Sequence, residues 1–213
     1  MPQQKRTRGR PATRTQDETR SALIAAAKAV FLTDGYGNTT IEAVAQRSGM
    51  STKTIYKVVE NKAELFRLVI EDAIRTGIAT LIAPRAEDDP RAALFALSRY
   101  YAEIVLGSDG VMTARAVMAD QAQFPELRES YIRSIARVAD AFDDRFHALI
   151  GRLTDSHPDL TVDDAVMLRS MINGPQRMAI LDREASWSQN DIASWSERCL
   201  QLVLTARGRR MAG

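Results

Sequence analysis

Residues 38–65 constrain the fold of this chain more than any other stretch, because helix starts and a helix stop follow one another closely there. Thr39 and Glu42 have the spacing of a capping box, which predicts a helix start. Gly49 supplies the left-handed residue that ends this helix after about two turns. Ser51 can cap the next helix, and Asn61 with Glu64 can cap a third. The pattern predicts a helix-turn-helix in which a short second helix is held between two others.

The short second helix is expected to present a polar outer face. Ile55 and either Val58 or Val59 should face inward, which leaves five hydrogen-bonding or cationic residues outward: Thr52, Lys53, Thr54, Tyr56 and Lys57. A helix of this size fits the major groove of duplex DNA, where its first residues reach base edges. We therefore expect Ser51 and these five residues to contact DNA. The alternative is that Thr39, Ser51 and Asn61 are only caps and that Tyr56 only packs.

Three further residues are expected to hold phosphates. Thr39, Thr40 and Lys62 stand at predicted helix starts, where free N–H groups and the helix dipole favour an anion. These residues would position the unit on DNA.

The charge of the chain is concentrated at its N-terminus. The net charge is +2, but residues 1–62 alone carry eleven Lys or Arg against five Asp or Glu. Residues 1–16 read as a basic flexible arm, and Arg8-Gly9-Arg10-Pro11 resembles the core of an AT-hook, which predicts that Arg8 and Arg10 enter an A·T-rich minor groove. The alternative is a solvated tail that adds only nonspecific attraction.

Residues 20–66 resemble the DNA-binding domain of the TetR family of transcriptional regulators. The match rests on these elements: Arg20, Ile24, Ala27, Phe31, Gly35-Tyr36, Thr39-Thr40-Ile41, Val44-Ala45, Ser48-Gly49-Met50-Ser51, Thr54-Ile55-Tyr56, Lys62 and Leu65. Lys53 departs from the pattern because the family usually has glycine there, and Val58-Val59 replace a usual His-Phe pair. Residues 115–131 also resemble the AefR-like branch.

The resemblance implies an all-helical homodimer with two parts. Residues 17–62 would form the helix-turn-helix DNA-binding domain, and residues 63–213 would bind a small-molecule effector and dimerise. Most proteins of this kind repress transcription from a double-stranded DNA operator and leave it when the effector binds.

Composition and periodicity also indicate an all-α chain. The chain is 45% hydrophobic and 26% charged, and it lacks runs of alternating β-branched residues. We expect about nine helices, at residues 15–35, 39–49, 51–59, 62–81, 91–106, 111–122, 125–153, 162–181 and 191–206. A lone cysteine suits a reducing compartment, and no secretory signal or bilayer-spanning window is recognisable, so we expect a cytoplasmic protein without a membrane partner.

Two sets of apolar residues in the C-terminal part are candidates for binding. A dimer interface made by the last helices would use Met167, Met171, Met178, Ile192, Trp195, Cys199, Leu202 and Val203. An effector pocket between the middle helices would use Phe95, Tyr101, Met112, Met118, Phe124, Tyr131 and Trp187. The alternative for both sets is ordinary intrachain core.

The sequence gives little indication of an enzyme. It contains no phosphate loop, nucleophile elbow, HExxH or CxxC, so we expect no catalytic residues and no cofactor. Asp143 and His147 could offer two metal ligands on one helix face, but a solvated ion pair is the favoured interpretation and no metal is expected. The competing function is a DNA-binding protein without a small effector, controlled by a protein partner or acting architecturally.

Overall fold

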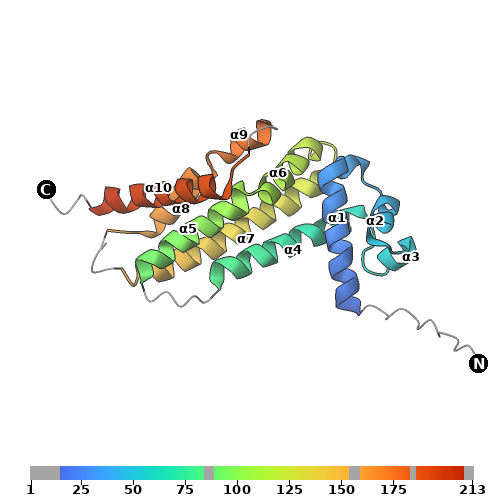
Figure 1. Ribbon diagram of the computed structural model, residues 1–213, viewed down its shortest axis with the longest axis horizontal. Coiled ribbons are helices and arrows are strands. Elements are labelled where there is room, and N and C mark those ends of the chain that lie inside the picture. Colours follow the sequence, from blue (N-terminus) through green and yellow to red (C-terminus); the bar gives the residue numbers. More distant parts are fainter. Residues whose placement is uncertain (1–14, 84–88, 154–158, 183–185, 209–213) are drawn as a thin grey trace, which may run out of the picture.

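The computed structural model describes residues 15–83, 89–153, 159–182 and 186–208, and these residues form ten helices without a strand. The helices are α1 (Gln16–Asn38), α2 (Ile41–Ser48), α3 (Thr52–Ile55), α4 (Lys62–Ile82), α5 (Pro90–Leu106), α6 (Ser108–Asp120), α7 (Pro125–Ile150), α8 (Val162–Asn173), α9 (Gln176–Leu181) and α10 (Gln189–Gly208). Figure 1 shows α1 to α3 gathered at one end of the long helices α4, α5 and α7, with α1 lying across them.

The all-α prediction is confirmed, and one predicted helix is split. The stretch predicted as a single helix over residues 162–181 is interrupted at Gly174-Pro175, which divides it into α8 and α9. Proline has no N–H to continue the helical ladder and its ring crowds the preceding turn. The short helix α9 therefore leaves the direction of α8 and packs against α6.

The first helix runs further than its sequence predicts. Gly35 was expected to end it, but α1 continues to Asn38 across a kink at Gly35, whose φ of 77° and ψ of 166° are not helical. A left-handed φ costs glycine little. The kink turns Tyr36 into the interior, where 2% of the residue remains exposed. Only Thr39 and Thr40 then remain between α1 and α2.

An aromatic cluster joins the N-terminal helices to the rest of the molecule. The ring centroid of Tyr36 lies 5.7 Å from that of Phe31, 5.3 Å from Phe66 of α4 and 4.9 Å from Phe124, just before α7. Edge-to-face and offset pairs at such separations are favourable beyond their buried area. The hydrophobic core around α1 to α4 thus includes a residue far along the chain, and Leu127 of α7 also belongs to it.

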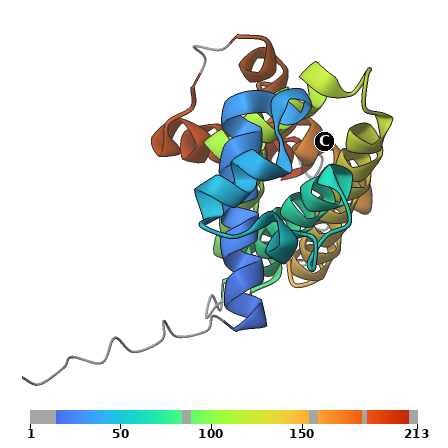
Figure 2. The same cartoon turned by 90° about the vertical axis from the view of Figure 1, so that its right-hand side faces the viewer.

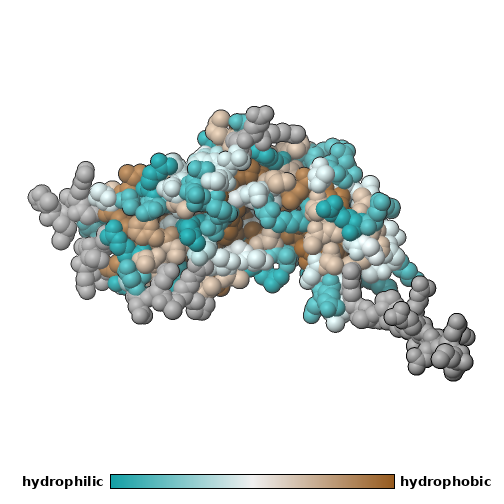
Figure 3. Space-filling view, in the orientation of Figure 1, coloured by the Kyte–Doolittle hydropathy of each residue, from teal (hydrophilic) through white to brown (hydrophobic). Residues whose placement is uncertain are grey.

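A second core is built from long helices in the C-terminal part. Its centre is formed by the fully buried Phe142 and Phe146 of α7, packed among side chains of α5, α8 and α10. A carboxylate is buried in the same part: Asp164 of α8 is 1% exposed and is paired with Arg207 of α10 at 2.8 Å. In Figure 3, brown hydrophobic patches are visible between teal side chains over these helices.

The expected ion pair between Asp143 and His147 is not formed. Asp143 instead accepts two hydrogen bonds from the Arg169 guanidinium of α8, at 2.7 and 2.8 Å. A bidentate guanidinium–carboxylate pair is stronger than a solvated contact along one helix, and the sequence could not show that α8 packs beside α7. Within the described ranges, no three His, Cys, Asp or Glu side chains gather as metal ligands.

Among the residues that the structure describes, every helix is too short or too polar to span a lipid bilayer.

Candidate nucleic-acid interface

The candidate recognition helix α3 is a single turn of helix with a capped start. The Ser51 Oγ accepts a hydrogen bond from the Thr54 backbone N–H at 3.1 Å, which satisfies a free donor of the first turn. Gly49 ends α2 with a φ of 67°, as its position in the sequence predicts. The turn between α2 and α3 is therefore fixed on both sides by local chemistry.

The recognition helix is shorter than predicted. Regular α-helix ends at Ile55, and the next residues form tighter turns in which Lys57 N bonds to Thr54 O and Val58 N to Ile55 O. β-Branched valines favour helix less than unbranched residues do. Of the two valines, Val59 is the buried one at 2% exposed, and Ile55 beside it is fully buried.

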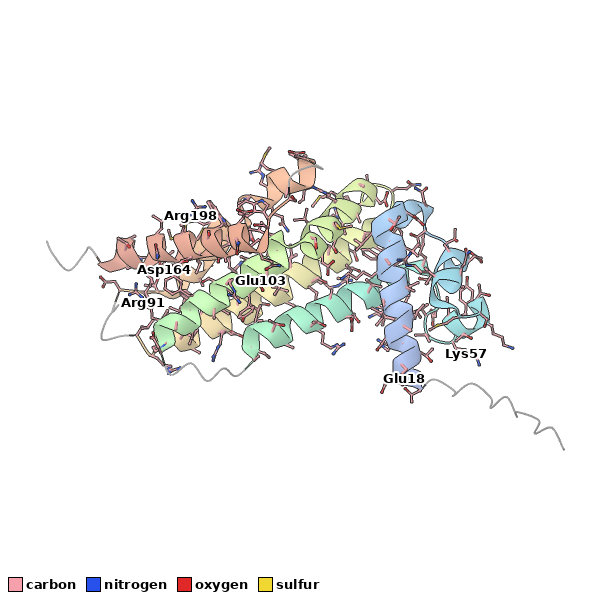
Figure 4. The ribbon with its side chains drawn as sticks, viewed as in Figure 1. Glu18, Lys57, Arg91, Glu103, Asp164 and Arg198 are labelled. Atoms are coloured by element: carbon pink, nitrogen blue, oxygen red, sulfur yellow. The ribbon has the colours of Figure 1, made fainter. Side chains whose placement is uncertain are left out.

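Three side chains of this segment face solvent at the outer end of the molecule. Lys53, Tyr56 and Lys57 are exposed, and Tyr56 keeps 53% of its surface accessible. Thr52 and Thr54 are half-buried. In Figure 4, Lys57 projects away from the long helices. A large aromatic left in water beside two lysines has the chemistry of a surface for bases and phosphates.

The start of α2 differs from the predicted arrangement. Thr40 is the cap, since its Oγ1 accepts a hydrogen bond from Ala43 N at 3.1 Å, and Thr40 is exposed. Thr39 is 2% exposed and its hydroxyl donates to Gly35 O at 2.6 Å. The extension of α1 past Gly35 is the reason, because it places Thr39 at the end of that helix. Thr40 remains available to a phosphate, whereas Thr39 faces inward.

Lys62 is occupied by the protein itself. Its Nζ donates to three carbonyl oxygens at the end of α1, those of Tyr36 at 2.8 Å, Gly37 at 3.1 Å and Thr39 at 3.0 Å. It also lies 4.6 Å from the centroid of the Tyr36 ring. A cation is favoured at the carbonyl end of a helix by its dipole. In this arrangement the ammonium group joins α4 to α1.

The predicted minor-groove residues Arg8 and Arg10 lie outside the described residues. Their contribution stays a prediction.

Comparison with known proteins identifies the family. Residues 23–69 match the model of bacterial regulatory proteins of the tetR family. Residues 92–206, more than half of the chain, match the C-terminal domain of AefR-like transcriptional repressors. The chain belongs to the TetR family. It is thus a transcriptional regulator with a DNA-binding helix-turn-helix. None of the curated proteins matches it significantly.

Solved structures of TetR-family and other regulators share this fold along most of their length. A protein from Mesorhizobium loti described as a TetR-family transcriptional regulator is 20% identical to this chain. The match covers 91% of this chain and 98% of that protein, with a TM-score of 0.70. The flavonoid-responsive regulator FrrA is 21% identical, with coverages of 89% and 97% and a TM-score of 0.64. A transcriptional regulator from Rhodococcus sp. Rha1 is 18% identical, with coverages of 89% and 97% and a TM-score of 0.65.

The seven predicted effector-pocket residues do not gather around one cavity. Phe124 and Tyr131 pack against the core around α1 to α4. Phe95, Tyr101 and Trp187 belong to the C-terminal core, where the Tyr101 hydroxyl donates to Asn173 Oδ1 at 3.2 Å and burial raises its pKa. Met112 and Met118 of α6 are exposed. The helices that carry these residues therefore point them to three different surroundings.

Two hollows stand out in the described part of the C-terminal helices, and of the seven predicted residues only Trp187 lines either of them. One, of about 20 Å³, lies between α4, α5 and α7 beside Leu97, Tyr100 and Arg145, and is too small for more than about one water. The other, about 250 Å³, is open to solvent along α10, between Trp187 and Arg198.

The eight predicted dimer residues fall into three groups by their exposure. Ile192, Cys199 and Val203 are at most 4% exposed and belong to the intrachain core, where burial raises the pKa of the Cys199 thiol. For these three the alternative of intrachain packing holds in the protomer. Met167, Met178 and Leu202 are each more than half exposed, while Met171 and Trp195 are half-buried. Solvent-exposed apolar side chains on α8 to α10 leave surface for a partner.

Proposed function

We propose that this TetR-family chain is a homodimeric repressor that binds a palindromic operator and is released by a small-molecule effector in the cytoplasm. The observation that carries the DNA-binding part is the exposed face of the α3 segment. There the Tyr56 ring and two lysines stand on a backbone fixed by the Ser51 cap, the Gly49 turn and the buried Ile55. A recognition element needs both exposed chemistry and a rigid base.

The contacts we propose follow the exposure of the side chains. Lys53, Tyr56 and Lys57 would reach bases and phosphates, with Thr52 and Thr54 at the edge of the same face and Ser51 mainly a cap. Thr40 would hold a phosphate at the start of α2, because its hydroxyl and the free N–H groups face solvent. Arg8 and Arg10 would add minor-groove contacts from the N-terminal arm. We assign residues 17–62 to the DNA-binding domain and residues 63–213 to effector binding and dimerisation.

A dimer through α8 to α10 would present two copies of α3 on one side of the duplex. The exposed Met167, Met178 and Leu202 would be covered by the same residues of a second copy, as a two-fold interface requires. Two recognition helices can then enter successive major grooves, about 34 Å apart.

Release by an effector would act through α4, which begins at the helix-turn-helix (HTH) domain and packs along α7. A ligand can weaken DNA binding only if it binds one spacing of the two recognition helices more tightly than the other. The fully buried Phe142 and Phe146 in the core of the C-terminal helices support a second candidate, a DNA-binding protein controlled by a protein partner or acting architecturally. If the protein is an effector-released repressor, the effector would have to open this core or bind in the surface hollow beside Trp187.

Selection of duplexes from a random pool tests the proposal. The chain should enrich a palindromic sequence and bind it at moderate salt in preference to random competitor, as one dimer per site. Lys57→Ala and Tyr56→Ala should weaken binding, whereas Thr39→Val, which removes an inward hydroxyl, should change it little. Absence of any preferred duplex would refute the DNA-binding proposal.

A thermal-shift screen of small molecules separates the two candidates. A compound that raises the melting temperature and also releases the selected duplex would establish effector gating. If stabilising compounds left DNA affinity unchanged and a co-purifying protein released the duplex instead, the second candidate would be correct.

A further inference from the structure

The helix α6 is bonded to α1 at both of its ends. At its start, the Asp109 carboxylate lies 2.5 Å from the Nζ of Lys28, in the middle of α1. At its end, the Asp120 Oδ2 accepts a hydrogen bond from Gly37 N at 2.9 Å, in the last turn of α1. Figure 2 shows the two helices meeting at the upper end of α1, as Figure 1 does. These contacts cross more than 80 residues of sequence.

The α6–α7 turn, which runs over residues 120–126 from the last residue of α6 to the second residue of α7, holds the same end of α1. Glu126 Oε1 accepts a hydrogen bond from the Tyr36 hydroxyl at 3.3 Å. Burial first, and then the Glu126 carboxylate, raise the pKa of this hydroxyl, so it stays a donor across the physiological range. The Phe124 ring packs edge-on against Tyr36, and the Lys62 Nζ lies 5.5 Å from its centroid.

The fit between these segments is close. A Cβ placed on Gly37 would lie 3.6 Å from Asp120 Oδ1 and 3.8 Å from Cε2 of Phe124. The end of α1 therefore rests on the α6–α7 turn on one side while Lys62 of α4 binds its carbonyls on the other. Thr39, the residue that leads into α2, is bonded to this same end.

The middle of α6 is bonded to the C-terminal region. Arg115 donates through Nε and Nη2 to the carbonyl oxygen of Ala179, and through Nη2 to that of Asp182, at the end of α9. A guanidinium is favoured at this carbonyl end for the same reason as Lys62 on α1. Helix α6 thus connects the HTH domain to the segment that follows α8.

We infer that the α6–α7 turn is a second attachment of the HTH domain, and that Asp120 and Glu126 are positioning residues for DNA binding. The inference rests on the proposed DNA-binding function and adds to it. With α4 as the only connection, the HTH domain could pivot about one helix, and two recognition helices in a dimer would lose their spacing. A second attachment restricts that motion in advance, so less freedom is lost when DNA is bound.

The test compares charge-removing variants on and off this attachment. Asp120→Ala and Glu126→Ala, combined in the full chain, should weaken binding to the selected duplex by about five- to twentyfold. Asp34→Ala and Glu129→Ala remove two exposed carboxylates from α1 and α7 and serve as the matched control, which should stay within about twofold of the parent. The slope of log K against log salt should be unchanged in all of them, because none of these residues would contact a phosphate.

A conservative substitution provides the rescue. Asp120→Asn keeps a side-chain oxygen that can accept the hydrogen bond from Gly37 N, whereas Asp120→Ala removes it. In a Glu126→Ala background the Asp120→Ala protein should bind the duplex weakly, and the Asp120→Asn protein should return to within about twofold of Glu126→Ala alone. Equal affinities for the two Asp120 variants would show that this hydrogen bond does not position the HTH domain.

Calorimetry gives a readout that does not depend on DNA. The parent should unfold in one transition that includes the HTH domain, and the Asp120→Ala, Glu126→Ala variant should show an earlier, separate transition of the N-terminal helices. A parent without any preferred duplex would refute the proposed function while leaving this readout to test the attachment. Affinity and calorimetry equal to those of the matched control would overturn the inference.

Discussion

The HTH domain and the C-terminal helices use polar side chains in opposite ways. In the HTH domain the polar groups cap short helices at the surface, as Ser51 does for α3 and Thr40 for α2. In the C-terminal part they pair across helices, as the buried Asp164 does with Arg207 and the partly buried Asp143 with Arg169. The first kind of bond spans three residues of sequence, and the second kind spans 43 and 26 residues.

This difference follows from what each region must present. A recognition surface has to keep cationic and aromatic groups in water, so its rigidity must come from caps, a turn glycine and a small core. Long helices that bury one another can accept internal ion pairs because each charge finds a partner and hydrogen bonds. Exchanging the two strategies would leave DNA-binding groups buried or core charges unpaired.

The largest expected effect contrasts an aromatic residue from each region. Phe142→Ala empties the centre of the C-terminal core and should lower the free energy of unfolding by about 3–5 kcal/mol. Tyr56→Ala should change stability by less than about 0.5 kcal/mol, because its side chain is mostly in water. Tyr56→Ala should instead weaken binding to the selected duplex about tenfold. Denaturant unfolding and fluorescence anisotropy measure the two quantities, and equal destabilisation by both variants would contradict the comparison.

Two lysines of the N-terminal region allow a similar comparison between a side chain bonded to the protein and one exposed to solvent. Lys62→Ala leaves three carbonyls at the end of α1 without their donor and should cost about 1–3 kcal/mol of stability, with no change in the salt dependence of DNA binding. Lys57→Ala should leave stability unchanged and reduce the salt slope by up to about 0.9. Titrations at several salt concentrations decide this, and a flattened slope for Lys62→Ala would show that its ammonium group reaches a phosphate.

The smallest expected effect concerns a single cap. Thr40→Ala removes the acceptor for Ala43 N at the start of α2 and should cost about 1 kcal/mol, while Thr40→Ser should restore it. Thr33→Ala is the control, because this exposed hydroxyl donates to Ala29 O within its own helix and alanine favours helix. Thermal unfolding of the three variants measures the order of their stabilities. A Thr33→Ala protein as unstable as Thr40→Ala would contradict a specific role of the Thr40 cap.

Sequence reasoning was most accurate where structure is decided locally. Ser51 caps α3 and Asn61 caps α4 as predicted, and Gly49 ends α2. It failed where a distant partner outweighs a local signal. Thr39 has the spacing of a cap, but its hydroxyl is bonded to Gly35 O at the end of α1, and Thr40 caps α2 instead.

The helical class, the helix-turn-helix and its family follow from local sequence signals, because caps, a turn glycine and apolar periodicity act between residues a few positions apart. Which polar residues face solvent depends instead on contacts between distant segments. Lys62 is bound to α1, Asp143 to Arg169, and Asp120 to Gly37. The reason is that a hydrogen bond between distant segments depends on how helices pack, and packing is set by the whole set of buried side chains at once.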